Sequence, residues 1–113
     1  KFLKSDKKNY QMDFRNSSES LREVALDIKE GADLVMVKPG MPYLDIIKLV
    51  KDSFKIPVFA YQVSGEYSLI KLGVKNKLIN NESILESLIS FKRAGATAIV
   101  SYFALEIAKK LKN

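Results

Sequence analysis

Residues 34–44 read Leu-Val-Met-Val-Lys-Pro-Gly-Met-Pro-Tyr-Leu, an apolar run that ends abruptly at a lysine. The stretch Leu34–Val37 is short, apolar and β-branched at two positions, which is typical of a strand buried on both faces. Pro39 and Gly40 then break the strand. We therefore expect Lys38 at the carboxyl end of a buried strand, where desolvation favours the neutral amine that attacks carbonyl groups.

Amphipathic helices are predicted on both sides of this strand. The stretch 17–20 offers helix-capping residues for the first helix, and Ser20 and Glu23 have the spacing of a capping box. Gly31 is expected to end that helix as a C-cap. The apolar faces are Leu21, Val24, Ala25 and Ile28 before the strand, and Leu44, Ile47, Val50 and Phe54 after it.

The rest of the chain continues the alternation. Strands are predicted at 58–61 and 98–101, a polar loop at 62–67, and helices at 68–75, from about 81 to Gly95, and at 104–111. Such alternation implies parallel strands joined by right-handed crossovers, as in a (β/α)8 barrel or a doubly wound sheet. With three strands, the segment is expected to be part of a barrel.

The composition limits the chemistry that this segment can support. Its 113 residues contain no cysteine and no histidine, so catalysis must rest on Lys, Tyr, Ser, Asp or Glu. The net charge is +6, but the lysines are scattered among acidic residues, which favours a solvated surface over a nucleic-acid site. No apolar run approaches the roughly 20 residues of a membrane span. The chain begins with Lys1, so we expect the natural chain to start upstream.

Polar side chains follow each predicted strand. Lys38 follows the first, Gln62 to Ser64 follow the second, and Ser101 and Tyr102 follow the third. Parallel α/β folds place their active sites at this edge, so an amine and two hydroxyls are expected to meet there. Lysine can form a Schiff base with a ketone, and the hydroxyls of Ser64 and Tyr102 can bind a carboxylate. Taken singly, each residue also has an ordinary role, as a snorkelling lysine, a turn serine or a half-buried tyrosine.

Six stretches of the chain resemble one enzyme family, in order and spacing. They are Tyr-Gln-Met-Asp at 10–13, Leu-Arg-Glu-Val-Ala-Leu-Asp at 21–27, Glu-Gly-Ala-Asp-Leu-Val-Met-Val-Lys-Pro-Gly at 30–40, Pro-Tyr-Leu-Asp-Ile-Ile at 42–47, Ala-Tyr-Gln-Val-Ser-Gly-Glu-Tyr at 60–67 and Phe-Lys-Arg-Ala-Gly-Ala at 91–96. They resemble the delta-aminolevulinic acid dehydratases, also called porphobilinogen synthases. The resemblance implies a TIM barrel that condenses two 5-aminolevulinate molecules into porphobilinogen. Residues 1–113 would be the C-terminal part of its single catalytic domain.

The resemblance also implies roles for individual residues. Lys38 matches the lysine that forms a Schiff base with one substrate, and Ser64 and Tyr102 match the hydroxyls that hold that substrate's carboxylate. Lys7 and Gln11 fall in the stretch that binds the carboxylate of the second substrate. Lys7 departs from the arginine usual in the family, so the charge is kept and the bidentate fork is lost.

The metals and partners that the resemblance implies are only partly represented in this chain. Glu23 matches a glutamate of an allosteric magnesium site at a subunit interface, and its alternative role is the capping box with Ser20. Zinc would be held by residues upstream of this chain, where the second catalytic lysine also lies. The family implies a homo-octamer or hexamer in the cytoplasm, or in the plastid of a eukaryote, with no nucleic-acid or membrane partner.

Two alternatives remain open at this point. The chain could be a non-catalytic half-barrel or a partner-binding subunit, because unpaired strand edges favour association. Another Schiff-base barrel, such as an aldolase, would share the lysine at the end of a strand. It would not account for the run Tyr-Gln-Val-Ser-Gly-Glu-Tyr at 61–67.

Overall fold

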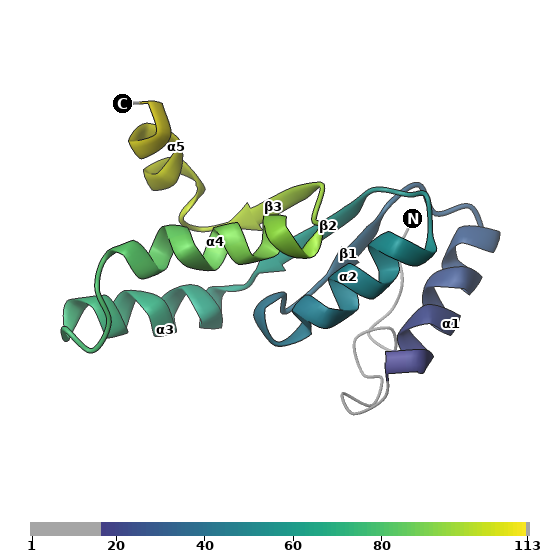
Figure 1. Ribbon diagram of the computed structural model, residues 1–113, viewed down its shortest axis with the longest axis horizontal. Coiled ribbons are helices and arrows are strands. Elements are labelled where there is room, and N and C mark those ends of the chain that lie inside the picture. The colour runs from purple at the N-terminus through teal and green to yellow at the C-terminus, as the bar shows by residue number, and fades with distance from the viewer. Residues whose placement is uncertain (1–16, 113) are drawn as a thin grey trace.

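The computed structural model describes residues 17–112, in which helices alternate with strands (Figure 1). The elements are α1 (Ser17–Lys29), β1 (Val35–Val37), a 3-10 helix (Met41–Tyr43), α2 (Leu44–Ser53), β2 (Val58–Gln62), α3 (Ser64–Lys75), α4 (Glu82–Ala94), β3 (Ala98–Ser101) and α5 (Ala104–Lys112). The predicted alternation is therefore confirmed. Each predicted strand lies within one residue of its observed bounds.

The strands form a parallel sheet in the order β1-β2-β3. Val37 of β1 pairs with Ala60 of β2, and Gln62 of β2 pairs with Ser101 of β3. All three carboxyl ends therefore lie at the same edge of the sheet, as the parallel topology predicted. Among the described residues, β1 and β3 each have one edge with no strand partner.

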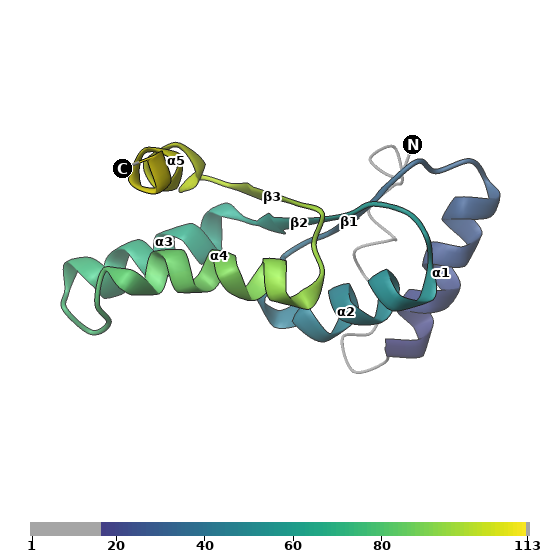
Figure 2. The same ribbon diagram turned by 45° about the horizontal axis from the view of Figure 1, so that its top comes forward.

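Helices α2 and α4 cover one face of the sheet, and α1 packs outside α2 (Figures 1 and 2). The strand residues on this face are apolar until Gln62 and Ser101 at the carboxyl ends. The side chains of Ile47, Val50 and Phe91 are fully buried between these helices and the sheet. This layer is the core of the described chain, and it keeps the carboxyl edge rigid.

The opposite face of the sheet carries the alternate strand residues, including Met36, Phe59, Tyr61 and Val100. Figure 2 shows that no helix among the described residues covers this face. These apolar side chains are half-buried or exposed. Strand alternation places Lys38, two residues beyond Met36, on the same open face.

Two predicted helix ends are confirmed, because both glycines adopt left-handed conformations. Gly31 has a φ of 101° and Gly95 has a φ of 115°, values that L side chains rarely adopt. At Gly95 the chain turns directly from α4 toward β3, and the next hydrogen bond runs from the Ala96 N–H to the Phe91 carbonyl. Glycine therefore fixes the short connection from helix to strand.

The predicted capping box at Ser20 and Glu23 is wrong, although α1 is described from Ser17, within the predicted capping stretch 17–20. The helix already includes Ser17, and Ser20 lies within it, 2% exposed. Ser20 is one turn before the buried Val24, so the buried face extends further toward the N-terminus than the apolar residues indicate. Ser20 and Glu23 therefore do not form a capping box at the start of this helix.

The predicted loop at 62–67 is also wrong. Gln62 belongs to β2, and α3 begins at Ser64 and not at Ser68. The Glu66 carboxylate accepts a hydrogen bond from the Val63 N–H at 3.1 Å, which stabilises the first turn of α3. The predicted loop or short strand over residues 1–15 lies outside the described residues. None of the helices in the described range is long and apolar enough to cross a membrane.

Candidate active site

Lys38 and two tyrosines form a line across the carboxyl edge of the sheet. The Lys38 Nζ lies 5.9 Å from the centroid of the Tyr61 ring. The hydroxyl of Tyr61 lies 3.4 Å from the hydroxyl of Tyr102, which follows β3. Because both contacts lie on the open face, the amine and the two phenols can reach one ligand placed over the sheet.

The buried neighbour Phe103 anchors the backbone at Tyr102, while the side chain of Tyr102 stays accessible to solvent. The side chain is 57% exposed, whereas the neighbouring Phe103 is fully buried. Tyr67 of α3 lies between them, with ring centroids 5.5 Å from Tyr102 and 4.5 Å from Phe103. The aromatic contacts therefore hold the turn after β3 against α3 and leave the Tyr102 hydroxyl at the open edge.

The hydrogen bond to Tyr102 raises the pKa of the Tyr61 hydroxyl, and desolvation adds a smaller effect. A raised pKa means that the neutral phenol persists to higher pH than in an isolated tyrosine. The Tyr61 hydroxyl is therefore protonated at neutral pH and can donate a hydrogen bond to Tyr102 or to a ligand.

This contact predicts a measurable change in titration. In Tyr102→Phe the partner hydroxyl is lost, so the pKa of Tyr61 should fall toward the ordinary tyrosine value. The ring carbon that bears the Tyr61 hydroxyl, followed by nuclear magnetic resonance across alkaline pH, reports this directly. Tyr43→Phe is the matched control and should leave the titration of Tyr61 unchanged. An unchanged titration in Tyr102→Phe would show that the two hydroxyls do not interact.

Ser64 lies at the same edge, as the first residue of α3, and its side chain is exposed. Within the described residues, it makes no hydrogen bond to Lys38 or Tyr102. The structure thus brings Lys38 and Tyr102 together through Tyr61, and places Ser64 at the same edge without a direct link.

Gln62 and Ser101 do not join this line, although both end strands. Ser101 Oγ donates to Gln62 Oε1 at 2.6 Å, and Gln62 Nε2 donates to Ser87 Oγ of α4 at 2.9 Å. Ser101 Oγ also accepts from the Phe103 N–H at 3.0 Å. These polar groups face the helices and satisfy one another, so they fix the ends of β2 and β3 and are not available to a ligand on the open face.

The loop after β1 is held tightly in place. The Gly40 N–H donates to the Tyr61 carbonyl at 2.9 Å, and the Met41 N–H donates to Glu66 Oε2 at 2.8 Å. A Cβ on Gly40 would overlap the ring of Phe91 and would lie 3.2 Å from the Tyr61 carbonyl oxygen. Glycine is therefore required for the close approach of this loop to β2 and α4.

Glu23 lies on α1, away from the carboxyl edge, one turn before Asp27. Burial raises the pKa of the Asp27 carboxyl, and the charges of Glu23 and then Glu30 raise it further. Asp27 Oδ2 is buried without a hydrogen-bond partner. Two nearby carboxylate groups with an unsatisfied oxygen fit the oxygen donors that Mg²⁺ prefers. Across residues 17–112, no group of three or more His, Cys, Asp or Glu side chains could hold a metal ion.

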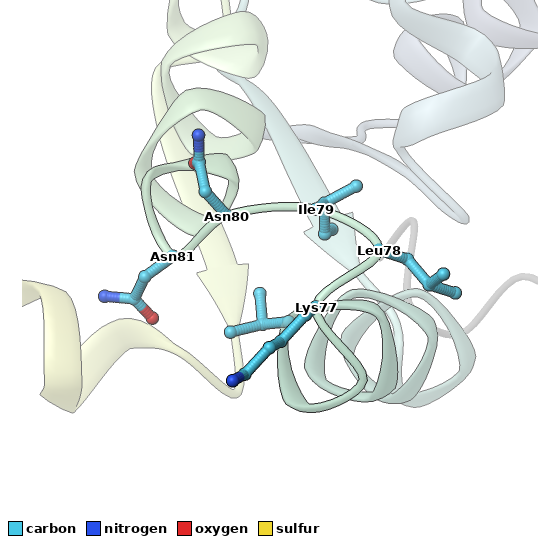
Figure 3. Close-up of a pocket in the computed structure, with 6 residues that line it drawn as sticks. Lys77, Leu78, Ile79, Asn80 and Asn81 are labelled. Atoms are coloured by element: carbon cyan, nitrogen blue, oxygen red, sulfur yellow. The ribbon is translucent and has the colours of Figure 1, made fainter.

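The remaining candidates lie elsewhere or outside the described residues. Lys7 and Gln11 fall in the stretch 1–16, which the structure does not describe. A pocket of about 450 Å³ lies at the turn between α3 and α4, lined by Val74, Lys77, Leu78, Ile79, Asn80 and Asn81 (Figure 3). It contains none of the candidate residues. Its polar side chains are one amine and two amides, and they lie at the turn between α3 and α4 and not at the carboxyl edge of the sheet.

Sequence reasoning missed two residues of this edge, Tyr61 and Glu66. Tyr61 could have been found from strand alternation, because it lies two residues after Phe59 and therefore faces away from the helices. Glu66 is three residues after Val63, a spacing that permits it to cap α3. The second hydrogen bond that its carboxylate accepts, from the Met41 N–H, joins α3 to the loop after β1 and has no signal in the sequence.

The chain is similar to known proteins over most of its length. A sequence model of the family described as delta-aminolevulinic acid dehydratase matches residues 2–110. The enzyme of that name from Bradyrhizobium diazoefficiens is 57% identical, over 100% of this chain and 32% of its own length. The one from Archaeoglobus fulgidus is 54% identical, over 98% of this chain and 34% of its own length. The chain thus spans about a third of the length of the curated relatives it matches.

A solved structure is similar over the same range. It is the delta-aminolevulinic acid dehydratase (porphobilinogen synthase) of Toxoplasma gondii ME49, in complex with the reaction product porphobilinogen. The TM-score is 0.85 at 48% sequence identity, and the match covers 94% of this chain and 30% of that one. The likeness confirms the expected fold class, an α/β fragment of a TIM barrel.

Proposed function

The chain belongs to the delta-aminolevulinic acid dehydratase family, and we propose that it is the C-terminal part of the catalytic domain of a porphobilinogen synthase. The complete enzyme condenses two molecules of 5-aminolevulinate into porphobilinogen, in tetrapyrrole biosynthesis. The observation that carries this proposal is the line of Lys38, Tyr61 and Tyr102 across the open face, in a chain that matches the family throughout.

Lys38 is the proposed nucleophile toward one substrate. Its amine nitrogen bonds to the ketone carbon, and the ketone oxygen leaves as water, which gives a protonated imine. The hydroxyls of Tyr102 and Ser64 are proposed to hold the carboxylate of the same molecule. The neutral Tyr61 phenol shares a hydrogen bond with the Tyr102 hydroxyl, so it helps to fix that hydroxyl at the same edge.

The second substrate requires residues that this part of the chain does not provide by itself. We assign its carboxylate to Lys7 and Gln11, and its imine to a second lysine upstream. A second lysine close to Lys38 would also favour the neutral amine by charge repulsion. Lys7 in place of arginine is expected to bind the carboxylate less tightly, unless Lys8 adds a further contact.

A magnesium ion is proposed to bind at Glu23, with Asp27, one turn further along α1, as a second oxygen donor and water as the remaining ligands. The support is the unsatisfied Asp27 oxygen beside the Glu23 charge. The ion would neutralise these carboxylates and act allosterically, with no part in bond making. Zinc, where used, would be bound by upstream residues.

Assembly and location are proposed from the family alone. We expect a homo-octamer or hexamer, in the cytoplasm or, in a eukaryote, in the plastid. Two plant relatives are named as chloroplastic, from Pisum sativum and Spinacia oleracea. Neither a nucleic acid nor a membrane is part of the proposal.

The test compares the complete enzyme with the 113-residue chain. Purified complete enzyme should form porphobilinogen from 5-aminolevulinate, detected by its colour reaction with an aromatic aldehyde. The 113-residue chain alone should form none, because the second lysine is missing. No product from the complete enzyme would refute the proposed activity. Product from the 113 residues alone would refute the claim that the site is shared with an upstream segment.

A further inference from the structure

The Glu66 carboxylate connects the loop that carries Lys38 to the start of α3, where Ser64 lies. Oε2 accepts a hydrogen bond from the Met41 N–H at 2.8 Å, and Oε1 accepts one from the Val63 N–H at 3.1 Å. We refer to this pair of hydrogen bonds as the Glu66 bridge. An ionised carboxylate only accepts hydrogen bonds, so each oxygen is matched to a donor, and such charge-assisted bonds are stronger than neutral ones.

The bridge does more than cap a helix. Capping of α3 needs only the bond from Val63, whose N–H would otherwise be unsatisfied. The bond from Met41 spans 25 residues of sequence and stabilises no helix turn of α3. It ties the loop that follows Lys38 to the residue that precedes Ser64.

The Lys38 loop is also held in place by contacts other than the bridge. Gly40 is hydrogen-bonded to the Tyr61 carbonyl and lies against the Phe91 ring. At the start of α3, Ser64 and Gly65 are exposed, and a Cβ added to Gly65 would meet nothing within 4 Å, whereas Tyr67 in the same turn packs against Phe103. The Glu66 bridge therefore fixes the start of α3, and with it Ser64, relative to the Lys38 loop.

We propose that Glu66 is a positioning residue that sets the distance between the Lys38 amine and the Ser64 hydroxyl, and thereby the substrate's spacing between ketone and carboxylate. The inference rests on the proposed function. In 5-aminolevulinate two methylene groups separate the ketone from the carboxylate. An amine and a hydroxyl at a fixed distance select an oxo acid of that length over one with an additional methylene group.

The test uses Glu66→Gln and Glu66→Asp in the complete enzyme. Glutamine keeps one acceptor oxygen and points an NH₂ group at the other N–H, so one bond of the bridge is lost. Aspartate keeps the charge but is shorter, so it is expected to retain the bond from Val63 and lose the one from Met41. Glu82→Gln is the matched control, because Glu82 is also an acidic residue in the first turn of a helix and is exposed.

The readout is the binding of two simple oxo acids, 4-oxopentanoate and 5-oxohexanoate. Each is trapped on Lys38 with borohydride, and the concentration for half-maximal trapping is measured. The wild-type enzyme should prefer 4-oxopentanoate, and both Glu66 variants should lose about tenfold of that preference, with a comparable rise in the KM for 5-aminolevulinate. Glu82→Gln should match the wild type.

The outcomes distinguish a positioning role of Glu66 from a role in stability alone, and they distinguish both from a failure of the proposed function. If both Glu66 variants keep the wild-type preference and KM, even with a lower melting temperature, Glu66 only caps α3 and the proposal is overturned. A preference lost in both variants supports it, and if one variant does not fold the other decides. A wild-type enzyme that traps oxo acids but makes no porphobilinogen would refute the proposed function. The trapping preference of the Glu66 variants would then still decide the role of Glu66.

Discussion

Replacement of Lys38 by alanine is expected to abolish the borohydride-trapped 5-aminolevulinate adduct in this segment and to lower kcat/KM of the complete enzyme by roughly a thousandfold or more. The physical reason is that Lys38 is the amine at the carboxyl edge of the described sheet that lies over Tyr61, within reach of Tyr102. An imine requires a primary amine, and neither tyrosine nor serine can replace it. The adduct is located by mass spectrometry of peptides from this segment.

Two further variants test whether Lys38 acts as a nucleophile or only as a positive charge. Lys38→Arg keeps the positive charge, but a guanidinium does not lose its proton and does not form this imine, so it should be as inactive as Lys38→Ala. Lys48→Ala is the control, because Lys48 is exposed on α2 and pairs with Asp52 at 3.0 Å. Its activity should equal that of the wild type. A full-strength adduct on this segment in Lys38→Ala would remove Lys38 from the mechanism.

Replacement of Phe91 by alanine is expected to lower the free energy of unfolding by about 3–5 kcal/mol, the largest stability effect that we predict. Phe91 is fully buried in α4, and its ring supports Gly40 in the Lys38 loop. Truncation leaves a cavity beneath that loop, so activity should fall together with stability. Denaturant unfolding of the complete enzyme at fixed protein concentration measures the loss, since the stability of an oligomer depends on concentration.

The controls for Phe91 lie on the same helix and in the facing loop. Ile89→Ala, at a position 47% exposed, should cost about 1 kcal/mol or less. Gly40→Ala should cost about 1–3 kcal/mol because its methyl group overlaps the Phe91 ring. In the Phe91→Ala background the same substitution should cost less, because the cavity accepts the methyl group. Equal costs in both backgrounds would show that Gly40 and Phe91 do not pack against each other.

The strands and most helices could be predicted from sequence because their signals are local. Apolar runs before Lys38, Gln62 and Tyr102 marked the strands, and Gly31 and Gly95 marked helix ends that the positive φ angles confirm. The alternation of helix and strand then required a parallel sheet with its carboxyl ends together. The meeting of Lys38 and Tyr102 at one edge follows from that topology.

The predicted capping box in α1 and the predicted start of α3 show where local signals end. Ser20 lies within α1 and is buried, so it is not the cap that its spacing from Glu23 indicated. α3 begins at Ser64 because Glu66 satisfies the Val63 N–H. In both cases the deciding group is polar, and its partner or its burial depends on the folded chain.

The sequence by itself determined that Lys38 lies at the carboxyl edge of the sheet, because a buried strand that ends in Lys38-Pro39-Gly40 places its lysine at a carboxyl end whatever else the chain does. The tertiary structure decided which polar groups join it there. It turned Gln62 and Ser101 toward α4, where they bind each other and Ser87, and it placed Tyr61 and Tyr102 on the open face. The reason is strand alternation combined with helix packing: adjacent residues face opposite sides of a sheet, and only the packed helices determine which side is buried.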